Sequence, residues 1–266
     1  PNCPAFLAMM IAVWKAGGTV TPLNLQAGLA PTVEALVHSD VSAVFAPQGM
    51  DQIIQGLAAS GLPAVGVPLD GPLPSFQSRT RERSDPEIAV LFYTSGTTGS
   101  PKGVPITHSN LHDNVTKSIY HFKDLESDDI FINVLPNFHT LGFTTSGLLP
   151  LLGGYPQAIM PTFMPPESAI ECIKAAEVTV MIAVPTMVAL MLGAIARGAE
   201  PPSSLRLLVT GGDRFPARLD ARTKQLLGVS VLEGYGLTET SPVVSINESV
   251  ARRKLGTVGT VLEGYD

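Results

Sequence analysis

The chain has 266 residues, 45% of them hydrophobic, which is enough to bury a core in one large domain or two small ones. Its formal net charge of -6 leaves no basic footprint for DNA or RNA, so we expect no nucleic-acid partner. Two cysteines, Cys3 and Cys172, provide neither a disulfide framework nor a metal-ligand cluster, and they favour a reducing, cytoplasmic compartment.

The first residues carry no Met start and no basic segment ahead of the apolar stretch, so they do not predict a signal peptide. The sequence opens in what reads as the middle of a helix at residues 6–16. We therefore expect a piece of a longer protein.

Helical patterns alternate with short apolar segments through the first part of the chain. Helices are predicted at residues 6–16, 31–39 and 52–59, and strands at residues 19–22, 42–46 and 64–67. Such alternation is typical of an α/β fold with stacked, mostly parallel β-sheets covered by helices.

Residues 68–85 are rich in Pro and then in charge, which predicts an exposed linker. We expect a first α/β subdomain over residues 1–70, a linker over 71–87, and a second α/β subdomain over 88–266 that carries the binding motifs.

Residues 178–196 are uncharged and nearly long enough to cross a bilayer, which takes about 20 residues. Pro185 falls near the middle of this segment, and residues 178–184 are rich in β-branched side chains. A buried strand, a turn at Pro185 and a buried helix explain the segment better than a membrane span, so no transmembrane segment is expected.

A loop rich in Gly, Ser and Thr follows an apolar strand at residues 88–93 and precedes a helix that begins near Ser109. Its two glycines permit positive φ and a close approach to a ligand, and its hydroxyl and N–H groups suit an anion. The predicted nucleotide-binding residues here are Thr94, Ser95, Gly96, Thr97, Thr98, Gly99 and Lys102. Lys102 is followed by Gly103, so the loop differs from the Walker A pattern of kinases and GTPases.

A second glycine motif, Val209-Thr-Gly-Gly-Asp213, follows an apolar strand at residues 205–209. Gly211 and Gly212 are thus predicted at the carboxyl end of a strand, where open α/β sheets bind ligands. Taken alone, this pair of glycines is read better as a structural turn.

A third motif reads Glu233-Gly-Tyr-Gly-Leu-Thr-Glu239. Because Gly234 and Gly236 flank Tyr235, nothing blocks the face of that ring, and it can stack on a base. Thr238 offers a hydroxyl to phosphate, and Glu239 offers a hard oxygen ligand for Mg²⁺.

Residues 130–166 contain no Asp, Glu, Lys or Arg, a composition that predicts burial or an apolar pocket. Taken alone, His139 in this stretch is read best as a packed core histidine beside Phe138. We expect Gly142 and Gly234 to leave room for a substrate's acyl chain.

These motifs resemble, in sequence and in order, those of adenylate-forming enzymes, which include acyl- and aryl-CoA synthetases, luciferases and the adenylation domains of nonribosomal peptide synthetases. Residues 93–105 are similar to the family's signature loop. Residues 233–239 resemble the motif to which adenine, phosphate and Mg²⁺ contacts are assigned, and Lys254-Leu-Gly-Thr-Val-Gly259 resembles the segment downstream of it.

The resemblance assigns further roles. It implies that Gly211 and Gly212 border the adenine, while Asp213 departs from the Ala or Glu that often follows these glycines. In acyl- and aryl-CoA synthetases a similar Phe-His pair borders the carboxylate and the pantetheine tunnel. Amino-acid-activating domains commonly carry an Asp there, so His139 implies a carboxylic acid other than an amino acid.

The implied reaction is ATP-dependent activation of a fatty or other carboxylic acid to an acyl-adenylate, with Mg²⁺, and transfer to a thiol such as coenzyme A. The catalytic residues it implies are Lys102, His139, Thr238 and Glu239. The acceptor stays open between coenzyme A, a carrier protein and oxidation of the adenylate, and peripheral membrane contact stays open for a long-chain acid.

Family members continue with a ribose-binding Thr-Gly-Asp segment, a hinge and a small C-terminal domain that supplies a lysine. None of these occurs in this sequence, so we expect this piece to turn over slowly or not at all without that domain as its partner. One alternative is a catalytically silent nucleotide-binding or regulatory module with the same fold. Another is an unrelated oxidoreductase, but the Gly-x-Gly-x-x-Gly turn that it would need is not found.

Overall fold

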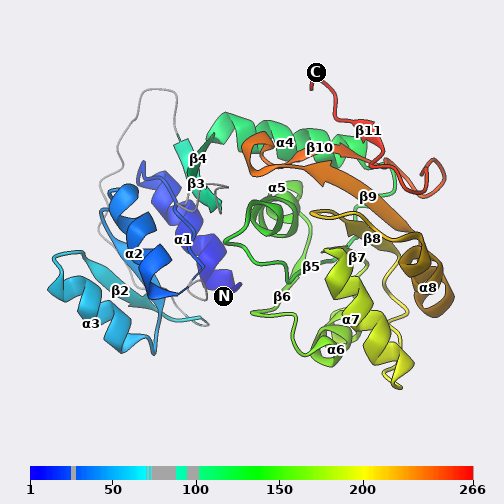
Figure 1. Cartoon of the computed structure of the whole chain (residues 1–266), viewed down its shortest axis with the longest axis horizontal. Helices are drawn as coiled ribbons and strands as arrows, with labels where there is room; N and C mark the ends of the chain where they lie inside the picture. Colours follow the sequence, from blue (N-terminus) through cyan, green and yellow to red (C-terminus); the bar gives the residue numbers. More distant parts are fainter. Residues whose placement is uncertain (25–27, 70, 72, 74–87, 95–101, 266) are drawn as a thin grey trace. The chain divides into compact units, whose positions relative to one another are not determined.

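The computed structural model describes residues 1–24, 28–69, 71, 73, 88–94 and 102–265. It divides into two compact units, an N-terminal unit of Cys3–His108 and a C-terminal unit of Ser109–Asp266 together with Pro1–Asn2. Figure 1 shows the elements of both units in the order of the chain.

The N-terminal unit contains three helices and two small sheets among its described residues. Its elements are α1 (Pro4–Lys15), α2 (Leu29–His38), β1 (Val44–Pro47), α3 (Asp51–Ala59), β2 (Ala64–Val67), β3 (Ile88–Thr94) and β4 (Lys102–Thr107). β1 and β2 are parallel neighbours, and the chain between them contains α3. The helices and strands predicted up to residue 67 are confirmed within a few residues, except that the strand predicted at 19–22 is reduced to one bridge, between Val20 and Val90.

The predicted phosphate loop at residues 93–105 is shorter than expected, because strands occupy both of its ends. β3 pairs antiparallel with β4, and the pairing reaches Thr94 and Lys102. Pro105 also lies within β4, at the edge position that a strand proline tolerates. Residues 95–101, with the predicted Ser95, Gly96, Thr97, Thr98 and Gly99, lie outside the described residues.

The two units divide at His108 and not within the predicted linker at 71–87. The reason is that β3 is bonded to the first part of the chain. Ala89 O accepts from Val20 N at 3.0 Å and from the indole Nε1 of Trp14 at 2.8 Å, and Val20 O accepts from Leu91 N at 2.9 Å. These bonds join β3 to residues far away in the sequence. Most of the predicted linker lies outside the described residues.

The C-terminal unit is built on a seven-stranded sheet with the order β11-β10-β9-β8-β7-β5-β6. Its strands are β5 (Phe131–Asn133), β6 (Gln157–Ile159), β7 (Val180–Ala183), β8 (Leu207–Thr210), β9 (Val231–Gly236), β10 (Val243–Ile246) and β11 (Thr260–Val261). The five strands from β6 to β9 are parallel, and β10 and β11 add an antiparallel edge. The expected α/β fold with a mostly parallel sheet is confirmed.

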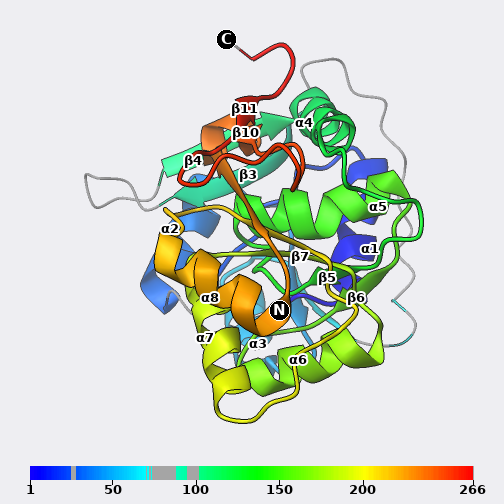
Figure 2. The ribbon, with the colours of Figure 1, turned by 90° about the vertical axis from the view of Figure 1, so that its right-hand side faces the viewer.

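Helices cover both faces of this sheet. They are α4 (His108–His121), the π-helical segment η2 (Gly142–Leu148), α5 (Leu149–Gly153), α6 (Pro166–Ala175), α7 (Pro185–Ala196), α8 (Ala217–Leu227) and the 3₁₀ turn η3 (Thr238–Thr240). α6, α7 and α8 lie side by side on one face, and α5 lies on the other (Figure 2).

The apolar stretch at residues 178–196 divides as the sequence predicts. β7 is fully buried, and α7 begins at Pro185, a position where the missing N–H of proline costs no helix hydrogen bond. In the part of the chain that the structure describes, no helix has both the length and the apolar character needed to cross a bilayer.

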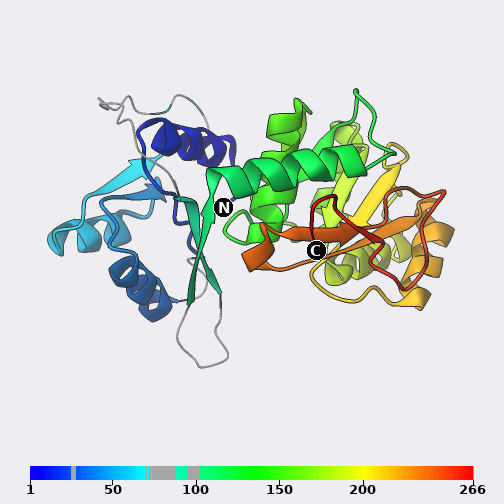
Figure 3. The same cartoon turned by 90° about the horizontal axis from the view of Figure 1, so that it is seen from above.

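Helix α4 runs along the β10 side of the sheet (Figure 3). Asn114 Nδ2 donates to Val243 O at 2.7 Å and to Thr240 O at 3.2 Å, and His121 Nε2 lies 3.0 Å from Ile246 O. Asn114 is fully buried, so these bonds satisfy an amide that would otherwise be costly to bury.

A buried carboxylate joins the amino ends of three parallel strands. Asp129 precedes β5, Thr179 precedes β7 and Arg206 precedes β8. Asp129 is 1% exposed and accepts from Thr179 Oγ1 at 2.5 Å, from Arg206 Nη2 at 2.6 Å and from Glu126 N at 2.8 Å. This cluster fixes the edge of the sheet that lies opposite the carboxyl ends.

Candidate nucleotide and acyl site

Three of the motifs found in the sequence follow the carboxyl ends of parallel strands. The segment with His139 follows β5, Gly211 and Gly212 follow β8, and the Thr238–Thr240 turn follows β9. Because β5, β7, β8 and β9 are parallel, these ends meet at one edge of the sheet. In α/β proteins this edge is where ligands bind.

A cavity of about 100 Å³ lies at this edge of the C-terminal unit. The residues predicted for nucleotide or substrate binding that line it are His139, Gly211, Gly212, Gly234, Tyr235, Gly236 and Thr238. The fold therefore brings together residues from three motifs. The most distant of these residues, His139 and Thr238, are about 100 positions apart in the sequence.

The turn that carries His139 is held by a buried amide. Asn137 is 2% exposed, and its Nδ2 donates to Asn133 Oδ1 at 3.1 Å and to Gly142 O at 3.0 Å. Its backbone N–H donates to Asn2 Oδ1 at 2.9 Å. These bonds close residues 136–142 into a compact turn and orient His139 toward the cavity that it lines.

His139 keeps an exposed edge, but the protein around its ring removes part of the water. This desolvation lowers the pKa of His139 below its ordinary value, so the ring is neutral near pH 7. The Nδ1 atom accepts a long hydrogen bond from Leu141 N at 3.4 Å. In a neutral ring the proton then resides on Nε2, which can donate to a ligand.

Gly142 does not line the cavity. It lies close to the backbone of Leu135 and Pro136. A Cβ atom at this position would stand 2.3 Å from Pro136 O and 2.7 Å from Leu135 O. The geometry thus explains the glycine by a close approach of two backbone segments. A role of Gly142 in making room for an acyl chain stays a prediction.

The glycines beside Tyr235 have a similar structural reason. A Cβ on Gly236 would lie 2.0 Å from Pro242 O, and a Cβ on Gly234 would lie 3.2 Å from Ser245 O. Both positions let β9 and β10 approach closely. The side chain of Tyr235 is 48% exposed, which leaves its ring accessible.

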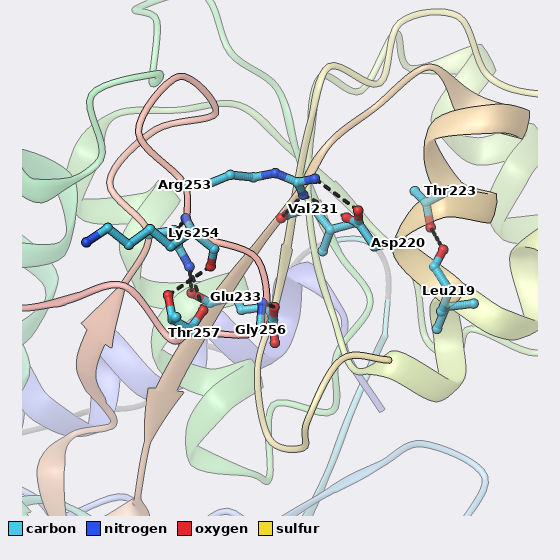
Figure 4. Close-up of polar contacts among 10 residues, drawn as sticks. Leu219, Asp220, Thr223, Val231, Glu233, Arg253, Lys254, Gly256 and Thr257 are labelled. Carbon is cyan, nitrogen blue, oxygen red and sulfur yellow. Dashed lines mark hydrogen bonds and ion pairs between the residues drawn. The ribbon is translucent and has the colours of Figure 1, made fainter. Parts of the chain in front are cut away.

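Glu233 is engaged by the segment that resembles the family's downstream motif (Figure 4). Its Oε1 accepts from Gly256 N at 3.2 Å, and its backbone O accepts from Asn247 Nδ2 at 3.0 Å. Asn247 also donates to Thr257 O at 2.8 Å and accepts from Lys254 N at 3.0 Å. The carboxylate and backbone of Glu233 therefore anchor residues 254–257 to β9.

Glu239 lies on the η3 turn and is exposed. In the described part of the chain it has no ion-pair partner, and no group of three or more His, Cys, Asp or Glu residues could hold a metal by itself. A single exposed carboxylate fits a Mg²⁺ ion that takes its other ligands from phosphates and water.

Other predicted residues of the C-terminal unit do not line the cavity. Asp213 is exposed, and its Oδ1 accepts from Arg214 N at 2.7 Å. Phe138 is half-buried and, like Glu239, does not line the cavity. Thr94 and Lys102 belong to the N-terminal unit, where they pair across β3 and β4, and Lys102 is exposed.

Several lining residues were not predicted. Ser118 and Phe122 are four residues apart at the end of α4, and Leu141, Thr145 and Leu149 repeat the same spacing through η2. This i, i+4 spacing puts each set on one helical face, and it is the signal that could have found them. Further lining residues come from strands or follow them, among them Ile182, Thr210, Val243 and Ile246.

Relatives of the chain are CoA ligases. It is 30% identical to a feruloyl-CoA synthase of Amycolatopsis, over 97% of this chain and 52% of that protein. It is also 30% identical to the human mitochondrial malonate–CoA ligase ACSF3, over 99% of this chain and 49% of that protein. The chain thus spans about half the length of these relatives.

The fold is also similar to those of solved structures. The fold matches ATP-bound MatB from Rhodopseudomonas palustris with a TM-score of 0.81 at 27% identity, over 98% of this chain and 52% of that one. It matches a malonyl-CoA ligase in a ternary product complex with methylmalonyl-CoA and AMP with a TM-score of 0.80 at 27% identity, over 99% and 56%. The AMP-binding enzyme family matches residues 1–266, and the chain belongs to this family.

Proposed function

We propose that this chain carries the nucleotide and acyl site of an AMP-forming acid–thiol ligase. In this reaction a carboxylate attacks the α-phosphate of ATP, which gives an acyl-adenylate and pyrophosphate. A thiol such as that of coenzyme A then takes the acyl group and releases AMP. The observation that carries the proposal is the single cavity lined by His139, by Gly211 and Gly212, and by residues 234–238.

The first step needs no general base, because a carboxylic acid is already ionised near neutral pH. Its barrier falls chiefly through positioning and through neutralisation of charge at phosphorus. We assign phosphate contacts to Lys102 and to the hydroxyl of Thr238, and a hydrogen bond to the reacting carboxylate to Nε2 of His139. Tyr235 would stack on the adenine with its exposed ring.

Mg²⁺, when bound, neutralises charge on the phosphates. We propose Glu239 as its protein ligand, because its carboxylate is exposed and free of ion pairs with the described residues.

Calorimetric titration with ATP and Mg²⁺ tests the site. Loss of a charge-assisted contact costs roughly 1.5–3 kcal/mol, so Lys102→Ala and Glu239→Gln should each weaken binding by about tenfold or more. Matched controls are Lys224→Ala on α8 and Glu171→Gln on α6, both at exposed positions outside the cavity lining.

Equal binding by the parent chain and both site variants would contradict the assignment of Lys102 and Glu239. Binding of the nucleotide without any pyrophosphate release, in a protein that includes the rest of the relatives' length, would favour a silent nucleotide-binding module. Pyrophosphate release by this chain itself, measured with a panel of acids, tests our expectation that it turns over slowly or not at all by itself.

A further inference from the structure

The cavity at the carboxyl edge of the sheet has an apolar wall. The residues that form it are Phe122, Leu141, Leu149, Ile182, Val243 and Ile246. Among the described residues that line the cavity there is no Asp, Glu, Lys or Arg. His139 is neutral near pH 7, so the lining offers no formal positive charge.

An apolar wall discriminates against charge. A carboxylate moved from water into such a cavity loses hydration and gains no cationic partner, which is unfavourable. A substrate with one carboxylate can leave that group at the reacting end, beside His139. A dicarboxylate would have to place its second charge against the apolar wall.

The volume of the cavity limits the size of the acyl group. The cavity measures about 100 Å³, whereas an apolar cavity of about 150 Å³ takes up benzene. Because Tyr235 and Thr238, which we assign to the nucleotide, line the same cavity, only part of this volume is left for the acyl group. The acyl group that it suits is therefore a short aliphatic group or at most a single ring. A long alkyl chain would leave most of its length outside.

From charge and volume together, and resting on the proposed function, we propose that the acid activated at this site is a monocarboxylate with a compact, uncharged acyl group. The similar malonate–CoA ligase takes its name from a dicarboxylate, and the similar long-chain-fatty-acid–CoA ligase of Bacillus subtilis from a long chain. The acid that we propose therefore differs from the acids after which both of these relatives are named.

Acyl-sulfamoyl adenosines test the proposal, because they share one nucleotide part and differ only in the acyl arm. Their affinities for the unmodified chain would be compared with that of AMP by calorimetry. Each CH₂ that enters an apolar cavity raises affinity about fourfold. We expect affinity to rise from acetyl to butanoyl, with benzoyl similar, and to level off before hexadecanoyl. The malonyl analogue should bind at least tenfold more weakly than butanoyl.

Two results would overturn the proposal while leaving the nucleotide site intact: tightest binding of the malonyl analogue, or affinity that rises through hexadecanoyl. If neither AMP nor any analogue binds, the proposed function itself fails and this inference fails with it. The two failures are therefore distinguishable.

A variant gives a second test. Phe122→Leu removes part of the cavity wall, so longer acyl arms should gain affinity relative to butanoyl, each affinity being taken relative to that of AMP for the same variant. Phe163→Leu is the matched control, because Phe163 is buried but does not line the cavity. An identical acyl ranking in both variants would contradict the assignment of Phe122 to the acyl wall.

Discussion

Arg253 and Asp220 form a two-point ion pair that joins the segment after β10 to helix α8 (Figure 4). Arg253 Nη1 lies 2.7 Å from Asp220 Oδ1, and Nη2 lies 2.9 Å from Oδ2. Arg253 Nη1 also donates to Val231 O at 2.7 Å, at the start of β9. The two side chains are 12% and 10% exposed. The pair therefore fixes α8, β9 and the segment that follows β10 in one arrangement.

Arg253→Ala should lower the free energy of unfolding by about 3 kcal/mol or more. The variant leaves the carboxylate of Asp220 buried without its cation, and breaking a buried pair in this way costs about 3–5 kcal/mol. Urea denaturation followed by circular dichroism measures the change.

Arg252→Ala is the matched control, one residue earlier. Arg252 is 77% exposed and pairs at 2.9 Å with Glu248, four residues earlier, an arrangement that contributes about 1 kcal/mol or less. Similar losses in the two variants would show that burial of the Arg253 pair has no energetic consequence.

The lowered pKa of His139 predicts a pH dependence of stability. Below the ordinary histidine pKa of about 6.5, the imidazole ring of His139 binds a proton more readily in the unfolded chain than in the folded chain. Stability contributed by neutral His139 is thus fully present above pH 6.5 and is lost as the pH falls through the folded pKa. His139→Gln should reduce the loss of stability between pH 7.5 and pH 5.

Urea midpoints measured across that pH range check this prediction. His112→Gln controls for the loss of a histidine, since His112 is exposed on α4. If His139→Gln and the parent chain lose stability in parallel, desolvation of His139 does not contribute.

Thr210→Val should stabilise the chain by about 1 kcal/mol. Thr210 is 1% exposed, and its hydroxyl has no hydrogen-bond partner among the described residues. A buried hydroxyl without a partner costs roughly 1–3 kcal/mol, and valine has nearly the same shape. In thermal unfolding the midpoint should rise by about 2–4 °C.

Thr223→Val makes the same chemical change where the hydroxyl is paired. Thr223 is fully buried, and its Oγ1 donates to Leu219 O at 2.8 Å (Figure 4). This variant should lower the midpoint by a similar amount. A lower midpoint for Thr210→Val would mean that its hydroxyl does have a partner.

Local sequence signals predicted the elements well where one residue decides the boundary. Pro185 at the start of α7 divides an apolar run of nearly membrane-spanning length into a strand and a helix, as expected. Strand β4 was not predicted, because Gly103 and Pro105 read as loop residues. They lie in a strand only because β3 pairs with them.

Long-range contacts explain the other differences. The composition of residues 71–87 suggested a boundary, but it carries no information on which unit β3 joins. That is decided by bonds such as Leu91 N to Val20 O, across about 70 positions. Likewise, the sequence indicated Gly234 and Gly236 as binding residues, while their closeness to β10 depends on the pairing of β9 with that strand.

The two ends of the parallel strands have different roles, one in stability and one in lining the cavity. The Asp129 cluster bonds together the segments before β5, β7 and β8, whereas the cavity is lined by residues at their other ends. In laboratory evolution, heat tolerance and ligand choice could therefore be improved in separate libraries, one for each edge of the sheet. Gains from the two libraries should then combine nearly additively, because distant sites that share no partners do so.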